Sequence, residues 1–143
     1  MRPLILAVAA VLVILTSQLA GAEVNMKDGL WEITTSIEMP GMPMAMQPIT
    51  VTQCLTKDNM VPEPQEQGAA CKVADMKQSG NTISWNVKCV SDGETMTSKG
   101  HITYSGTTFS GTIVSEAPTG MGAGPTTFTT KMQGRFLGPC QKK

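Results

Sequence analysis

The chain has 143 residues, with 11 basic and 11 acidic side chains and a formal net charge of zero. This balance lacks the basic surface that binds nucleic acid or an anionic membrane. The length suits a single domain with one core. We therefore expect no nucleic-acid partner and no division into two domains.

The N-terminal residues have the three parts of a secretory signal peptide. Arg2 supplies the basic start, an apolar run extends from Leu4 to Leu15, and the segment ends in Ala20-Gly21-Ala22. The apolar run is shorter than the roughly 20 residues that a membrane-spanning helix needs. We expect residues 1–22 to be removed, leaving one periplasmic β domain of residues 23–143 without a transmembrane segment.

Apolar and polar residues alternate along most of the remaining chain, which is typical of strands with one buried face. In the first such segment, Trp31 and Ile33 share the apolar face, whereas Glu32 and Glu38 share the polar face. Irregular alternation in the second and third segments predicts a bulge in each. Strands are predicted over residues 30–39, 49–55, 72–78, 82–90, 95–104, 109–113 and 128–136.

One short helix is predicted between the second and third strands, over residues 56–60. Thr56 can cap its start, and Pro62 and Pro64 would stop it. Short glycine-containing connections elsewhere are typical of antiparallel hairpins. Because no long helix can cover the apolar face, the strands must curl on themselves or form a sandwich. We favour an all-β fold, a curled antiparallel meander of about seven strands in a barrel or half-barrel.

The chain has 4 cysteines, and in an exported protein these are expected to form two disulfides. Zinc-binding cysteines cluster in motifs such as C-x-x-C, whereas the shortest spacing here is 17 positions. We favour the pairs Cys54–Cys71 and Cys89–Cys140. The alternative, Cys71–Cys89 with Cys54–Cys140, stays open because Cys71 falls opposite Cys89 across a predicted hairpin turn.

The methionine-rich loop, residues 39–48, reads MPGMPMAMQP. Its prolines disfavour burial in a sheet, and methionine is an adaptable hydrophobic contact. If the glycine- and proline-rich residues 116–125 lie at the same rim, the two loops would form an apolar entrance. The candidate ligand-binding residues are Met39, Met42, Met44, Met46 and Met121.

Three functions are compatible with this loop. The leading hypothesis is a non-enzymatic envelope protein that binds an apolar small molecule, lipid or peptide. Thioethers also suit Cu(I), so copper handling by Met39, Met42, Met44 and Met46 is the alternative. A structural or partner-binding envelope protein is the third hypothesis, with another envelope protein as its partner.

The sequence lacks motifs for enzymatic chemistry. It has no nucleophile elbow, phosphate-binding glycine loop or H-E-x-x-H pair. His101 falls on the polar face of its strand and is expected to be solvated, and Trp31 and Trp85 are expected to anchor the core. We therefore expect no enzymatic activity and no cofactor.

Several short segments, in this order, resemble exported bacterial proteins catalogued as domain of unknown function 3617. The resemblance implies a periplasmic location and supplies neither an assigned activity nor catalytic residues. It also implies that Met-Pro-Gly-Met-Pro belongs to the general pattern of the fold. The matching segments are Gly29-Leu30-Trp31-Glu32-Ile33-Thr34-Thr35, Met39-Pro40-Gly41-Met42-Pro43, Thr52-Gln53-Cys54-Leu55, Cys71-Lys72-Val73 and Gly134-Arg135-Phe136-Leu137-Gly138-Pro139-Cys140.

Overall fold

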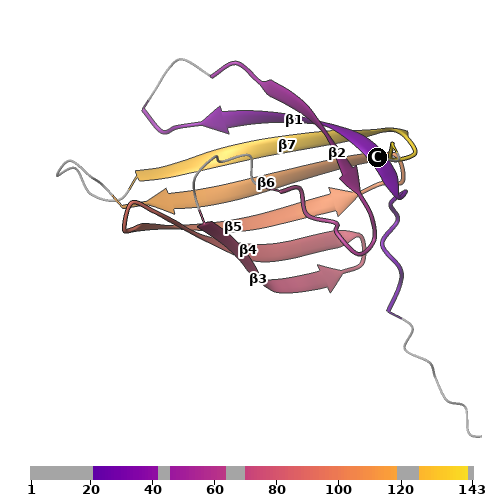
Figure 1. Cartoon of the computed structure of the whole chain (residues 1–143), viewed down its shortest axis with the longest axis horizontal. Helices are drawn as coiled ribbons and strands as arrows, with labels where there is room; N and C mark the ends of the chain where they lie inside the picture. Colours follow the sequence, from indigo (N-terminus) through magenta and orange to yellow (C-terminus); the bar gives the residue numbers. More distant parts are fainter. Residues whose placement is uncertain (1–20, 42–45, 64–69, 119–125, 142–143) are drawn as a thin grey trace, which may run out of the picture.

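The computed structural model describes residues 21–41, 46–63, 70–118 and 126–141. Within these ranges the chain forms one sheet of seven strands (Figure 1). The strands are β1 (Gly29–Glu38), β2 (Ile49–Leu55), β3 (Ala70–Ser79), β4 (Thr82–Ser91), β5 (Glu94–Tyr104), β6 (Thr108–Ala117) and β7 (Thr126–Gly138). Their order across the sheet is β2-β1-β7-β6-β5-β4-β3, and all neighbours are antiparallel.

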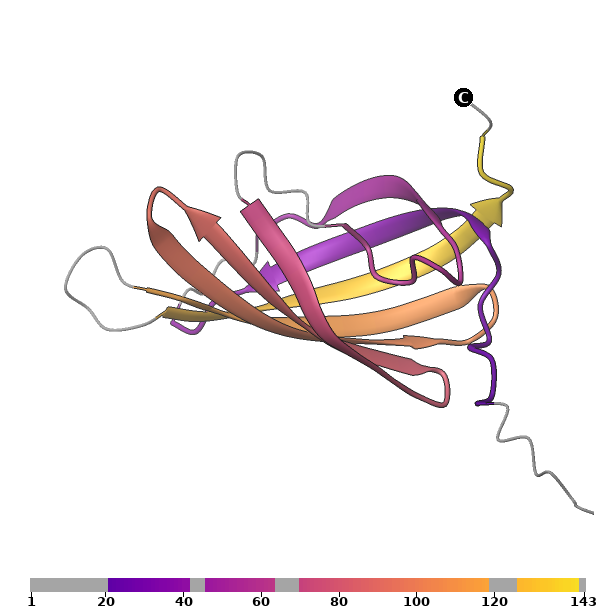
Figure 2. The ribbon, with the colours of Figure 1, turned by 60° about the horizontal axis from the view of Figure 1, so that its bottom comes forward.

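The sheet is bent into a trough that stays open along one side (Figure 2). β2 and β3 follow each other in the chain but are the two edges of the sheet. The strands from β3 to β7 pair in chain order, as expected for hairpins, and the pairing of β1 with β7 joins the two parts of the chain. The predicted all-β curled meander is therefore confirmed in the form of a half-barrel.

An aromatic cluster fills one end of the trough, here called the closed end, where β1 begins and β7 ends. Alternation places Trp31, Tyr104, Phe109 and Phe136 on the inner face, as predicted from the sequence for Trp31. Their ring centroids are 5.4 to 5.7 Å apart, and Trp31 is completely buried. Aromatic rings at these separations pack favourably, so this cluster forms a solid part of the core.

The segment before β1 covers the closed end. Val24 and Met26 are buried, and Met26 forms a parallel bridge with Gly106. The Asn25 N–H donates to Asn81 Oδ1 (2.9 Å), and Asn25 O accepts from the Gly106 N–H (2.7 Å). These bonds tie the segment to the turns after β3 and β5, so that solvent is kept from the aromatic cluster.

Residues 56–63, here called the strap, cross the inner face of the trough after β2. The predicted helix at residues 56–60 is wrong, since Thr56 and Asn59 form an antiparallel bridge around a tight turn. The Lys57 N–H donates to Asp28 Oδ1 (2.9 Å), a residue 29 positions away. The Tyr104 hydroxyl donates to Met60 O, and Val61 is buried. Tertiary contacts therefore override the weak local helix signal.

The disulfides are Cys54–Cys140 and Cys71–Cys89, so the favoured pairing is wrong and the alternative is correct. Cys71 and Cys89 are direct partners in the β3–β4 ladder. Cys54 lies instead at the closed end, where Leu30 of β1 pairs with Cys54 on one side and Gly138 on the other. The error arose from placing Cys54 and Cys71 at the same end, although β2 and β3 are opposite edges.

Of the two predicted bulges, the one in the third strand is confirmed. The β3–β4 register shifts between Ala74 and Lys77, and Asp75 has a φ of 53°. The Asn86 side chain donates to Asp75 Oδ2 (2.9 Å), which holds the bulge. The bulge predicted in the second strand is wrong, because β2 pairs with β1 in continuous register.

The predicted signal peptide falls almost wholly on residues 1–20, which lie outside the described residues. In the part of the chain that the structure describes, no helix is long and apolar enough to cross a membrane.

Candidate functional site

The methionine-rich loop and the β6–β7 connection leave the sheet at the same end, here called the open end. Glu38, the last residue of β1, pairs with Thr129 near the start of β7, and Ala117 at the end of β6 pairs with Thr126. The strand ends that flank the two connections are therefore neighbours at one rim. This arrangement depends on strand order, which sequence alone left undecided.

The candidate methionines are only partly described. Met39 is half-buried, and Met46 is 51% exposed. Met42, Met44 and Met121 lie outside the described residues. The structure thus places the strand ends around the two loops at one rim but does not test whether the thioethers meet.

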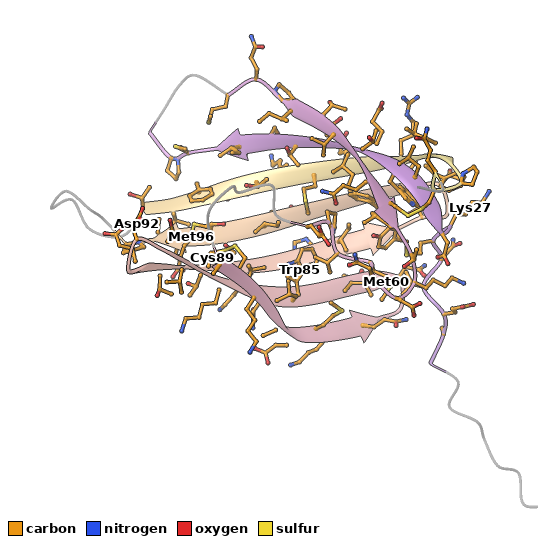
Figure 3. All side chains as sticks on the ribbon, viewed as in Figure 1. Lys27, Met60, Trp85, Cys89, Asp92 and Met96 are labelled. Carbon is orange, nitrogen blue, oxygen red and sulfur yellow. A yellow bond between two sulfur atoms is a disulfide. The ribbon has the colours of Figure 1, made fainter. Side chains whose placement is uncertain are left out.

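A cavity of about 330 Å³ lies on the inner face between the aromatic cluster and the open end. Figure 3 shows Trp85 on this inner face, with Met60 toward the closed end and Cys89 and Met96 toward the open end. All seven strands and the strap contribute to its wall. The lining residues are Ile33, Thr35, Ile37, Ile49, Val51, Gln53, Val61, Pro62, Glu63, Val73, Trp85, Val87, Cys89, Met96, Ser98, Ile113, Ser115, Phe128, Thr130 and Met132.

The trough is hollow at this end because small side chains occupy inward positions. Along β5 the inward residues change from Tyr104 and Ile102 to Gly100 and Ser98, and β6 ends with Ser115 inward. Gly100 makes room for Trp85, since a Cβ there would lie 2.5 Å from the indole ring. The indole therefore lies flat against the sheet and forms one end of the cavity, leaving the space beyond it unfilled.

Ser98 and Ser115 form a hydrogen-bonded pair in the cavity wall. They face each other in the β5–β6 register, their Oγ atoms are 2.8 Å apart, and they are only 7% and 4% exposed. Two hydroxyls that share one hydrogen bond keep a second O–H and free lone pairs. The pair is thus a neutral polar point that can bind a ligand oxygen or a water molecule.

The strap forms the wall of the cavity beside β2. Gln53 Nε2 donates to Glu63 O (3.2 Å), and the Glu63 N–H donates to Gln53 Oε1 (3.1 Å). These two hydrogen bonds resemble those between paired strands, and they fix the backbone of Glu63. Its carboxylate makes no ion pair among the described residues, and Glu63 is the only charged side chain in the lining.

A second hollow, of about 450 Å³, lies on the outer face of β1, β7 and β6. It is larger but shallower and more polar, and Glu32 and Arg135 form an ion pair in it (2.8 Å). Gly134 has its missing side chain on the opposite, inner face, where the Phe109 ring occupies the space. The apolar cavity on the inner face is the better candidate for binding, because ligand sites are concave and mostly apolar.

No metal centre is formed by the usual charged or thiolate ligands in the described ranges. There is no group of three or more His, Cys, Asp or Glu side chains, and all 4 cysteines are in disulfides. His101 is exposed on the outer face of β5, as predicted from the alternation. The Cu(I) hypothesis, which depends on Met42 and Met44, stays a prediction.

Sequence reasoning missed Ser98, Ser115, Gln53 and Glu63 as parts of the site. The available signal was the pair of small residues, Ser98 and Gly100, at inward positions of β5. Only the register of β5 with β6 places Ser98 opposite Ser115. Glu63 could not be found because it follows the predicted helix, in a segment without apolar–polar alternation.

Comparison with protein families gives a match over most of the chain. A family model described as a protein of unknown function (DUF3617) matches residues 26–140. The chain belongs to this family. The DUF3617 match begins at Met26 and ends at Cys140, so it includes all seven strands and both disulfides. Comparisons with curated proteins and with solved structures gave no match.

Proposed function

We propose that this DUF3617 protein is a non-enzymatic binding protein of the bacterial periplasm that holds an apolar ligand in the inner cavity. The single observation that carries the proposal is a partly open, mostly apolar cavity of about 330 Å³ beside the rim from which both methionine-containing loops leave. Ligand cavities commonly measure about 300–1,000 Å³ and combine apolar walls with a few polar groups. Ser98 and Ser115 supply such polar groups here.

Exposed apolar side chains at the open end also support binding. Ile49 is 58% exposed and lines the cavity, and Val73 on the opposite edge strand is 39% exposed. Their side chains face the trough from its two edges, so an apolar ligand would remove their surface from water. Burial of apolar area contributes about 25 cal/mol per Å², which is the main driving force that we expect for binding.

The proposed compartment has two supports. Disulfides form and persist in oxidising compartments, and the N-terminal residues have the composition of a signal peptide. The segment that would follow cleavage after Ala22 begins the cover of the closed end, where Val24 is buried. A mature chain starting at Glu23 would thus keep this cover.

Filling the cavity tests the proposal. Ser115→Leu places an apolar side chain in the hollow, and N-phenyl-1-naphthylamine, a neutral hydrophobic probe, reports binding by fluorescence. We expect the wild type to bind one probe saturably and the variant to bind at least tenfold more weakly. Ser84→Leu, on the exposed outer face of β4, is the matched control and should bind as the wild type does.

Loss of binding counts only if the fold is intact, which far-ultraviolet circular dichroism and urea unfolding would establish for both variants. Equal probe binding by folded Ser115→Leu and wild type would eliminate the cavity as the site. The rim is tested separately by Met39→Ser with Met46→Ser. If the rim guides entry, this double variant should slow probe association while leaving the cavity itself unchanged.

A further inference from the structure

The proposed function specifies only an apolar ligand, and the charge of the cavity wall indicates which charge such a ligand can carry. Among the lining residues that the structure describes, Glu63 is the only charged one. The connecting segments 39–48, 64–69 and 118–125 contain no lysine or arginine in their sequences. An anionic group that entered this space would lose its hydration and would find no cationic partner. Burying an unpaired charge in this way is costly.

Near the open end, the described Lys131 is already paired with an acidic residue. Lys131 Nζ lies 2.7 Å from Glu38 Oε1 on the outer surface. Asp92 and Glu94 flank the β4–β5 turn at the same end, while Lys72 and Lys88 lie on the outer faces of β3 and β4. The inner surface and its surroundings therefore favour a positive group over a negative one.

The position of Glu63 suits contact with a ligand head group. Its backbone is fixed by the paired hydrogen bonds to Gln53, while the residue itself is exposed. The side chain of Glu63 therefore begins from a fixed backbone position at the border between cavity and solvent. A head group beside it could remain partly hydrated while the attached chain enters the apolar space.

The size of the cavity limits the apolar part to one chain. Along β1 the lining residues run from Ile33 to Ile37, a distance of about 13 Å at the usual rise per strand residue. The volume of about 330 Å³ lies at the lower end of the range for small-molecule sites. This space accommodates one medium-length aliphatic chain and is too small for a lipid with two long chains.

From these observations, and resting on the proposed function, we propose that the ligand is a single-chain aliphatic amphiphile with a cationic head group. The chain lies along the inner face between Trp85 and Phe128, and the head group lies beside the Glu63 carboxylate. Ser98 and Ser115 contact the chain or a neutral oxygen on it. Glu63 is a specificity-determining residue in this arrangement.

Two probes with equal chains and opposite charges test the proposal. Dodecyltrimethylammonium and dodecanoate are each titrated, below their micelle concentrations, against the protein loaded with N-phenyl-1-naphthylamine. The wild type should bind the cation more tightly. The readout is the dissociation constant for dodecanoate divided by that for dodecyltrimethylammonium. The contribution of the common chain largely cancels in this ratio.

Glu63→Gln removes the charge and keeps the backbone bonds to Gln53. Unit charges about 4 Å apart interact by about 1 kcal/mol in water, which corresponds to about fivefold in each dissociation constant. The charge change should weaken cation binding and strengthen anion binding, so the dissociation constant for dodecanoate divided by that for dodecyltrimethylammonium should fall by about 25-fold. Glu116→Gln, on the outer face of β6, is the control and should leave the ratio unchanged.

The outcomes separate this inference from the proposed function. A cation preference that Glu63→Gln removes supports both. Displacement by both probes without a preference, or with one that Glu63→Gln does not alter, overturns the head-group assignment and leaves the proposed function standing. If neither dodecyl compound displaces the probe and the probe itself does not bind, both proposals are wrong.

Discussion

The Ser98–Ser115 pair allows a quantitative test of how dry the cavity wall is. Removing one hydroxyl with Ser98→Ala or Ser115→Ala leaves the other hydroxyl without its partner, at positions that are only 7% and 4% exposed. An unpaired buried polar group costs about 1–3 kcal/mol. Removing both hydroxyls eliminates the unpaired group and leaves two methyl groups in an apolar wall.

The expected magnitudes follow from this asymmetry. Because the pair borders the cavity and not the solid aromatic cluster, each single variant should lose about 1–2 kcal/mol, toward the lower part of that range. The double variant should lose about 0–1 kcal/mol. The coupling energy in the double-mutant cycle should therefore be about 1–4 kcal/mol.

Urea unfolding followed by tryptophan fluorescence measures these values, since Trp31 and Trp85 are both buried and will report loss of the core. The wild type, the two single variants and the double variant should have the same slope of unfolding free energy against urea concentration. Shifts in the unfolding midpoint then reflect changes in stability. Single variants that lose less than about 0.5 kcal/mol, with no coupling, would refute the reasoning. That result would mean that water replaces the missing partner and that the wall of the cavity is hydrated.

Gly134→Ala should lower the free energy of unfolding by about 1–3 kcal/mol, because the new Cβ would lie 1.9 Å from a Phe109 ring carbon; unchanged urea stability would show that the ring can move freely. Burial raises the pKa of Tyr104, so its stabilising contribution is complete below the unfolded pKa of about 10 and is lost as the pH rises above it. Stability should therefore fall above pH 10 less steeply in Tyr104→Phe than in the wild type, and parallel pH profiles would contradict this. Replacing both cysteines of a disulfide by alanine should cost about 4.6 kcal/mol for the 86-residue separation of Cys54–Cys140 and about 3.2 kcal/mol for the 18-residue separation of Cys71–Cys89. The reverse order in urea unfolding would show that chain entropy does not dominate.

Much of the sheet could be predicted because the side-chain period of a strand is read directly from neighbouring residues. Trp31, Ile33 and Trp85 are buried as their alternation indicates. The bulge at Asp75 was also visible as irregular alternation in β3. These features depend on local sequence, so each strand could be assigned without knowledge of its partners.

Features that depend on distant partners could not be predicted. Cys54 meets Cys140 because β7 returns beside β1, and no local pattern encodes that return. The strap forms a turn and not a helix because Asp28, Tyr104 and Gln53 bind its backbone from other elements. A short segment with few helical hydrogen bonds cannot compete with such contacts.

The candidate site likewise has a part that local sequence reveals and a part that depends on distant partners. The methionine-rich loop was recognisable as a connection because of its prolines, but the hollow next to it arises where small side chains of different strands meet. Ser98 and Ser115 are unexceptional in their own strands, and Glu63 lies in a segment without periodicity. Their common location follows from strand register and from the path of the strap.

The central claim is that the inner face, and not the outer face, holds an apolar ligand. Methyl resonances of Ile113 and Val114 test it most directly, because these adjacent residues of β6 face opposite sides of the sheet: Ile113 lines the cavity, and Val114 is 40% exposed outside. On titration with dodecyltrimethylammonium, the account predicts saturable shifts and ligand nuclear Overhauser effects at Ile113, with Val114 unchanged. Equal effects at both residues, or effects at Val114 alone, would contradict it.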